Sequence, residues 1–260
     1  MADLTFGETL GQLSNGSYNP WVESIFGYLK IIPIAYICRS WPGVTGLLNA
    51  LIPAGIKEQR KTHMRFSKER VDKRMARKTD RPDIWTFVTR HSDAEGTGLA
   101  PTELLSNGTL FMLAGTETTA SELSGLTYLL LRNPAQLERL IKEVRSAFSS
   151  FDDMTMTKLS QLEFLNACLE EGLRLYPPLA VGLPRTTPKG GAKVCGHWVA
   201  GGTTVQAPIY AASRSSSNWK DPEKFAPERF LPEGKQEYAS DRKDSLNPFS
   251  FGPRNCLGKK

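Results

Sequence analysis

Apolar residues recur at helical intervals through the first two thirds of this 260-residue chain. The longest run covers 102–131 and ends before Asn133-Pro134, which opens a second helix over 135–148. A third helix is expected over 159–175, because a Tyr-Pro-Pro sequence follows it. The pattern predicts a mainly helical region up to residue 178.

Beyond residue 178 the pattern changes to short β-prone pieces. Residues 192–194 and 203–206 favour strands, and the glycine pairs near them indicate hairpins over 179–212. Over 213–260 proline, serine, asparagine and charged residues predominate, which predicts a long irregular segment of the kind that is usually functional. The chain contains no internal repeat, so we expect one α+β domain over 1–260, mainly α with small β-sheets.

Positive charge is concentrated in one segment. The formal net charge is +6, and residues 57–78 hold ten lysines and arginines against three acidic residues. Met64, Phe66, Val71 and Met75 recur there at helix-like intervals, which favours a solvated helix face over a nucleic-acid-binding stretch. We expect no nucleic-acid partner.

The most apolar stretch near the start covers 25–38. Lys30 and Pro33 interrupt it, and it is shorter than the roughly 20 residues that span a bilayer. The first residues show neither the basic nor the apolar region of a secretory signal. We expect no membrane span in this chain.

Cysteine and histidine spacing argues against a zinc site, a disulfide framework or a histidine-based triad. The four cysteines are far apart and form no CxxC pair, and the three histidines are widely scattered. For Cys38, Cys168 and Cys195 we favour the interpretation of a buried free cysteine in a turn. Cys256 differs because of the residues around it.

The residues around Cys256 read Phe-Ser-Phe-Gly-Pro-Arg-Asn-Cys-Leu-Gly from 249 to 258. They contain the pattern F-x-x-G-x-R-x-C-x-G, whose five fixed residues at fixed spacings are a specific signal. This segment resembles the cysteine loop of the cytochromes P-450, which are haem-thiolate monooxygenases. The resemblance implies that Cys256 supplies the axial thiolate to the iron of haem b.

Each fixed position has a physical reason in such a site. A thiolate ligand donates electron density through iron and favours O–O cleavage. Gly252 and Gly258 let the backbone pass close to the porphyrin and aim N–H groups at the sulfur. Arg254 suits a haem propionate, and Phe249 would shield the sulfur from water.

The long helix over 102–131 contains a second part of the resemblance. Residues 114–119 match the family's oxygen-activation pattern [AG]-G-x-[DE]-T-[TS]. Ala114 and Gly115 would leave room for dioxygen above the iron. By resemblance, Thr118 would hold the iron-bound oxygen species and Glu117 would relay protons to it. The alternative is an ordinary capping or surface Glu-Thr pair.

Two further patterns follow in the family's order. Glu171 and Arg174 form the E-x-x-R of the proximal helix, and residues 225–230 match F-x-P-E-R-F. The resemblance implies that Glu171, Arg174 and Arg229 form a buried network that fixes the irregular segment against that helix. Taken alone, E-x-x-R also fits an exposed pair on any helix.

The stretch from Tyr176 to Arg185 resembles the family's approach to a substrate-facing strand. Arg185 would be a second propionate partner, and residues 179–183 would line the pocket beside the haem. The competing interpretation of those apolar residues is ordinary core.

The resemblance extends from a helix expected over 2–13 to Cys256. Members of the family are roughly twice as long, so we expect a domain truncated at both ends. The missing segments would include the helix after the cysteine, an early propionate contact and the N-terminal anchor. We therefore expect that this chain alone is not a competent monooxygenase.

The resemblance implies insertion of one oxygen atom from O2 into an apolar organic substrate, of the kind found in fungal secondary metabolism. Electrons would come from NADPH through a flavoprotein reductase, because the chain has no nucleotide-binding motif of its own. Family members are held at the endoplasmic reticulum surface; without an anchor this chain would be cytoplasmic. The alternatives are an inactive truncated remnant and a non-enzymatic helical interaction protein that uses the basic helix over 57–78.

Overall fold

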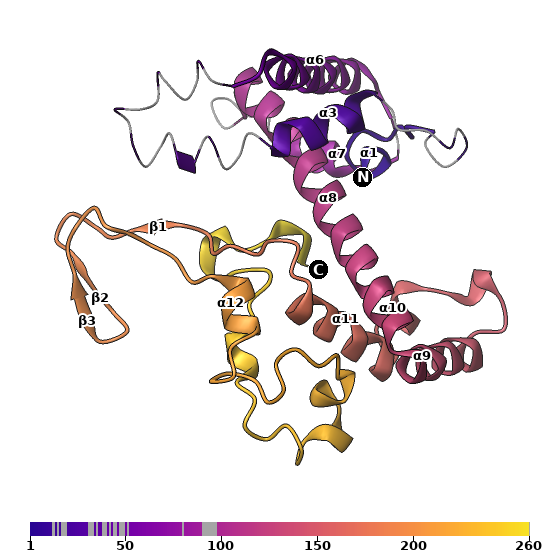
Figure 1. The fold of residues 1–260 in the computed structure, drawn as a ribbon. Helices are drawn as coiled ribbons and strands as arrows, with labels where there is room; N and C mark the ends of the chain where they lie inside the picture. The colour runs from indigo at the N-terminus through magenta and orange to yellow at the C-terminus, as the bar shows by residue number, and fades with distance from the viewer. Residues whose placement is uncertain are drawn as a thin grey trace. The chain divides into compact units, whose positions relative to one another are not determined.

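The computed structural model describes residues 1–11, 20–30, 52–79, 81–89 and 98–259, with isolated positions between 14 and 50 (Figure 1). The chain forms two compact units, Met1–Thr116 and Glu117–Lys260, so that one long helix contributes to both. A single domain over 1–260 stays a prediction. His91 and Cys38 lie outside the described residues.

The first unit is helical throughout its described elements. Helix α3 packs along α6, and Phe6, Trp21, Ile25 and Trp85 fill the core between the elements. The basic segment forms α6, in which Val71 is buried while Met64 and Met75 are exposed. The elements are α1 (Ala2–Phe6), α3 (Pro20–Leu29), α6 (Ala54–Ala76), α7 (Ile84–Thr89) and the first half of α8 (Pro101–Arg132).

Helix α1 is shorter than the helix expected over 2–13, because Gly7 ends it. Gly7 adopts the left-handed conformation with φ 66°, and its N–H donates to the carbonyl of Asp3. The guanidinium of Arg77 approaches so closely that a Cβ at Gly7 would lie 2.4 Å from it. Residues 12 and 13 lie outside the described part of the chain.

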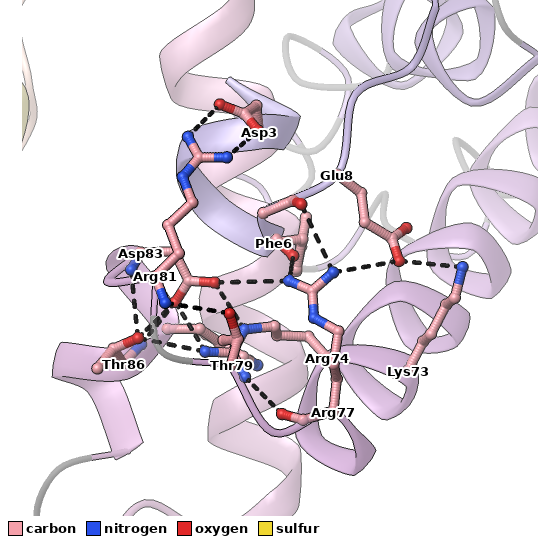
Figure 2. Close-up of polar contacts among 12 residues, drawn as sticks. Asp3, Phe6, Glu8, Lys73, Arg74, Arg77, Thr79, Arg81, Asp83 and Thr86 are labelled. Atoms are coloured by element: carbon pink, nitrogen blue, oxygen red, sulfur yellow. Dashed lines mark hydrogen bonds and ion pairs between the residues drawn. The ribbon is translucent and has the colours of Figure 1, made fainter.

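Polar side chains join α1, α6 and the start of α7 (Figure 2). Asp83 accepts two hydrogen bonds from Arg74, at 2.6 and 2.9 Å, and caps α7 by accepting the N–H of Thr86 at 2.8 Å. Arg77 donates to the carbonyl of Phe6 at 2.7 Å. These contacts hold the N-terminal turn on the end of α6.

The second unit contains the rest of α8 and the remaining elements (Figure 1). The helix expected over 159–175 is two helices, because residues 160–162 form a turn. The carboxylate of Glu143 then caps the second helix by accepting the N–H groups of Phe164 and Leu165, both at 2.9 Å. The helices are α9 (Pro134–Ala147), η2 (Phe151–Asp153), α10 (Met156–Leu159), α11 (Glu163–Leu175) and α12 (Ile209–Ser213).

Two small antiparallel sheets follow α11. Strand β1 (Arg185–Thr186) pairs with β4 (Thr204–Val205), and β2 (Ala192–Val194) pairs with β3 (His197–Val199). The β2–β3 turn places Cys195 at φ 49° and exposes it, so its interpretation as a buried thiol is wrong. Cys168 is buried as expected, but it lies within helix α11 and not in a turn. The expected class, mainly α with small sheets, is confirmed.

The segment after α12 contains only short 3-10 turns within residues 214–259, as its composition predicts. These turns are η3 (Pro227–Phe230), η4 (Pro232–Gly234), η5 (Lys243–Ser245), η6 (Gly252–Arg254) and η7 (Leu257–Lys259). Over the described residues, no helix combines the length and apolar character that crossing a bilayer would take.

Candidate functional site

A buried charge network joins α11 to the irregular segment. Arg174 donates to both carboxylate oxygens of Glu171, at 2.7 and 2.8 Å, and Arg229 donates to one of them at 3.1 Å. All three side chains are 0% exposed. The structure thus brings together the three residues that the sequence patterns single out, and the i,i+3 pair is buried rather than on the surface.

Backbone groups from the end of α12 and from the irregular segment complete the coordination of Arg174. Its guanidinium donates to the carbonyls of Ser213, Pro222 and Lys224, at 2.8, 2.6 and 3.0 Å. The N–H of Ala226 donates to Glu171 at 2.9 Å. Ser213 is the last residue of α12, and the other groups belong to the segment after it, so the network fixes that segment's path across α11.

Sequence reasoning missed the fourth charged member of the network. Asp241 accepts a hydrogen bond from Arg229 at 2.5 Å, and its side chain is also fully buried. Tyr238 covers the same guanidinium, with its ring centroid 4.3 Å from Cζ. Asp241 lies in a stretch without periodicity, so no spacing rule links it to Arg229.

The loop that carries Cys256 is closed by its own backbone. The N–H of Cys256 donates to the carbonyl of Phe249 at 2.8 Å, and Gly252 between them has φ 75°, which favours glycine. A Cβ at Gly258 would lie 3.9 Å from the sulfur of Cys256. Cys256 is exposed and Phe249 is half-buried, so the thiol is open to a ligand.

Arg185 and the cysteine loop border one cleft of about 440 Å³. Arg185 and Val205 line it from the β1–β4 pair and Leu183 from the segment before β1, and Ser250 and Phe251 line it from the loop. Arg185 and Arg254 are both exposed, and neither forms an ion pair with any described residue. Two cationic side chains are therefore available to an anionic group.

The oxygen-activation pattern lies within the continuous helix α8. Ala114 and Thr118, one turn apart, are both exposed, whereas Gly115 and Glu117 are half-buried. Partial burial raises the pKa of the Glu117 carboxyl above its ordinary value. The described hydrogen bonds and ion pairs do not join Glu117 to the Cys256 loop.

Comparison with known proteins identifies the family. A family model for cytochrome P-450 matches residues 4–260. The chain is 46% identical over 260 residues to the cytochrome P-450 monooxygenase efuB of Hormonema carpetanum. The aligned region covers 100% of this chain and 51% of that protein.

Other relatives agree over the same length. Identity is 46% over 259 residues with the cytochrome P-450 monooxygenase FUM2 of Gibberella moniliformis, covering 100% of this chain and 54% of the relative. It is 42% over 260 residues with AMT3 of Alternaria alternata, covering 100% and 52%. The chain spans about half the length of these relatives, and its match to the family model over almost every residue shows that it belongs to the cytochrome P-450 family.

Proposed function

We propose that the protein is a haem-thiolate monooxygenase in which Cys256 ligates the iron of haem b. It would insert one oxygen atom from O2 into an apolar organic substrate, with electrons from NADPH delivered by a flavoprotein reductase. The observation that carries this proposal is the exposed thiol of Cys256 within a loop closed by its own backbone, in a chain that belongs to this family. The named relatives are fungal monooxygenases, which supports a substrate from secondary metabolism.

The residues present fit the prosthetic group. The sulfur of Cys256 is accessible, and the absence of a side chain at Gly258 leaves the space beside it open. Arg254 and Arg185 would hold the propionates, because both guanidinium groups are exposed and form no ion pair among the described residues. When bound, the haem supplies oxygen activation, which a thiolate ligand favours.

The side chains of α8 would handle protons. Thr118 is exposed, and the half-buried Glu117 beside it has a raised pKa. A carboxyl with a raised pKa holds its proton closer to neutral pH and can release it where it is needed. The Glu171 network has a positioning role: it fixes the segment that leads into the cysteine loop.

The surroundings of Arg185 suit an apolar substrate. Leu183 and Phe251 contribute apolar surface to the cleft beside Arg185, which supports a hydrophobic substrate wall. We propose the endoplasmic reticulum surface as the location, where an NADPH-dependent reductase would meet the enzyme.

The proton-delivery role is tested by Thr118→Ala in the haem-loaded enzyme supplied with reductase. We expect haem content and substrate affinity to persist, while reducing equivalents are diverted from product to peroxide or water. Thr127→Ala, nine residues further along α8 and exposed as Thr118 is, is the matched control and should leave this ratio unchanged. Unchanged product formation per NADPH in Thr118→Ala would contradict the role assigned to Thr118.

A further inference from the structure

A buried carboxyl on α8 has no part in the site described above. Glu122 follows Thr118 by four residues, so it lies one helical turn further along α8. Its side chain is 8% exposed, and neither carboxyl oxygen has a hydrogen-bond partner among the described residues. Buried polar groups are nearly always paired, so a group of this kind requires a physical explanation.

The carboxyl lies against the backbone of α11. A Cβ atom at Gly172 would lie 2.5 Å from Oε1 of Glu122 and 3.3 Å from a methyl group of Leu126. Glu122 therefore occupies space that exists only because residue 172 is glycine, with the apolar side chain of Leu126 beside it. Such surroundings disfavour a charged carboxylate.

The cation of α11, Arg174, and its neighbour Arg229 are already engaged. Glu171, which precedes Gly172, binds Arg174 and Arg229, and the remaining donors of Arg174 go to backbone carbonyls. Burial raises the pKa of the Glu122 carboxyl to about 7, and no cation among the described residues offsets this effect.

The other titratable groups near this contact do not supply a cation to the Glu122 carboxyl. The ring of Tyr176, just beyond α11, packs against α8 at Gly125. Arg214, which borders the same part of α8, donates to the carbonyl of Leu175 at 2.8 Å and pairs with Glu223. On α8 itself the nearest charged residue is Glu117, a second carboxyl.

We infer that Glu122 is a proton-binding site that couples the packing of α8 against α11 to pH. The neutral carboxyl packs between Gly172 and Leu126. Loss of the proton leaves a carboxylate that is stabilised only by leaving this contact for water, which loosens α8 at this point. Because Thr118 is one turn away, ionisation would also act on the residue assigned to proton delivery; that consequence alone rests on the proposed function.

The coupling is measured through the buried thiol of Cys168 on α11, in a chain whose other three cysteines are serine. Its rate of modification, corrected for thiol ionisation, gives the opening constant of the second unit, the ratio of open to closed molecules. Between the ordinary carboxyl pKa and about 7, the folded state binds more protons than the unfolded state, so stability falls as pH rises. The opening constant should increase roughly tenfold per pH unit, or on the order of 100-fold in total.

Two variants isolate the carboxyl. Glu122→Gln keeps the shape and should abolish this rise, whereas Glu138→Gln, which neutralises an exposed carboxyl on α9, should retain it. A Glu122→Gln chain that keeps the full pH dependence would overturn the inference.

Direct titration of Glu122 provides a second measurement, by NMR of its ¹³C-labelled carboxyl. We expect a midpoint near 7, which Gly172→Ala should return toward the ordinary glutamate value because the added methyl group displaces the carboxyl. An ordinary midpoint in the unaltered chain would contradict the inference. Both measurements are made without haem or turnover, so their outcome is independent of whether the proposed monooxygenase activity is correct.

Discussion

Replacing Arg174 by methionine should destabilise the second unit severely. The substitution keeps much of the volume of the side chain but removes its charge and its five hydrogen bonds to Glu171 and to the backbone. The Glu171 carboxylate would stay fully buried, with Arg229 as its remaining cation, while Arg229 is shared with Asp241. Breaking a buried ion pair by removing one partner costs about 3–5 kcal/mol.

That cost is a large part of the stability of an ordinary domain, which is about 5–15 kcal/mol. At 1.4 kcal/mol per decade, the opening constant of the unit should rise roughly 100- to 5000-fold. Urea unfolding, followed by modification of the buried Cys168 thiol, measures this constant directly.

The matched control is Arg139→Met on α9, in the same unit. Arg139 pairs with Glu233 at 2.5 Å, but the two side chains are 40% and 51% exposed. The methionine preserves apolar contact with Phe164, over which the guanidinium lies. We expect a loss below about 1 kcal/mol. Equal losses at Arg174 and Arg139 would refute the argument that burial and backbone coordination make the network decisive.

Two further predictions concern the first unit. Arg74 and Thr86 hold the pKa of the Asp83 carboxyl at about 2, so its contribution to stability is present above the ordinary pKa and is lost as pH falls toward 2. Asp83→Asn should lower the free energy of unfolding by about 2 kcal/mol at pH 6 and reduce its dependence on pH between pH 5 and 3, as measured by urea unfolding. An unchanged pH dependence in the variant would contradict the contribution assigned to this ion pair. Burial lowers the pKa of His63, which accepts the indole N–H of Trp21 at 3.1 Å. Because the unfolded chain then binds more protons, stability should fall as pH drops below about 6.5, and His63→Gln should lose this dependence in the same urea titration.

The sequence predicted the elements whose signals are local. Pro101, Asn133-Pro134 and the prolines after Tyr176 bound the long helices within a residue or so, because proline acts on the backbone beside it. The shorter α1 was missed because the helix over 2–13 was expected from the family resemblance, which gives no sign that Gly7 adopts the left-handed conformation and ends the helix.

In the candidate site, too, the residues that belong to local patterns were predicted and those brought together only by packing were not. Glu171 and Arg174 are recognisable because they lie three residues apart on one helix, and Arg229 because it belongs to a specific pattern. Asp241 and the carbonyls of Pro222 and Lys224 that bind Arg174 come from irregular backbone, where no repeat relates sequence position to space. Glu122 was missed for a related reason: its burial depends on Gly172, a neighbour fifty residues away that only the packing of α11 reveals.

The most direct test of the account is the spectrum of the haem-loaded, reduced protein under carbon monoxide. Ligation through Cys256 predicts the red-shifted Soret band of a thiolate-bound haem. Cys256→Ser should lose that band, whereas Cys195→Ser, which removes the other described exposed thiol, should keep it. A Cys256→Ser protein that retains the thiolate band would show that the iron ligand lies elsewhere and would contradict the central claim.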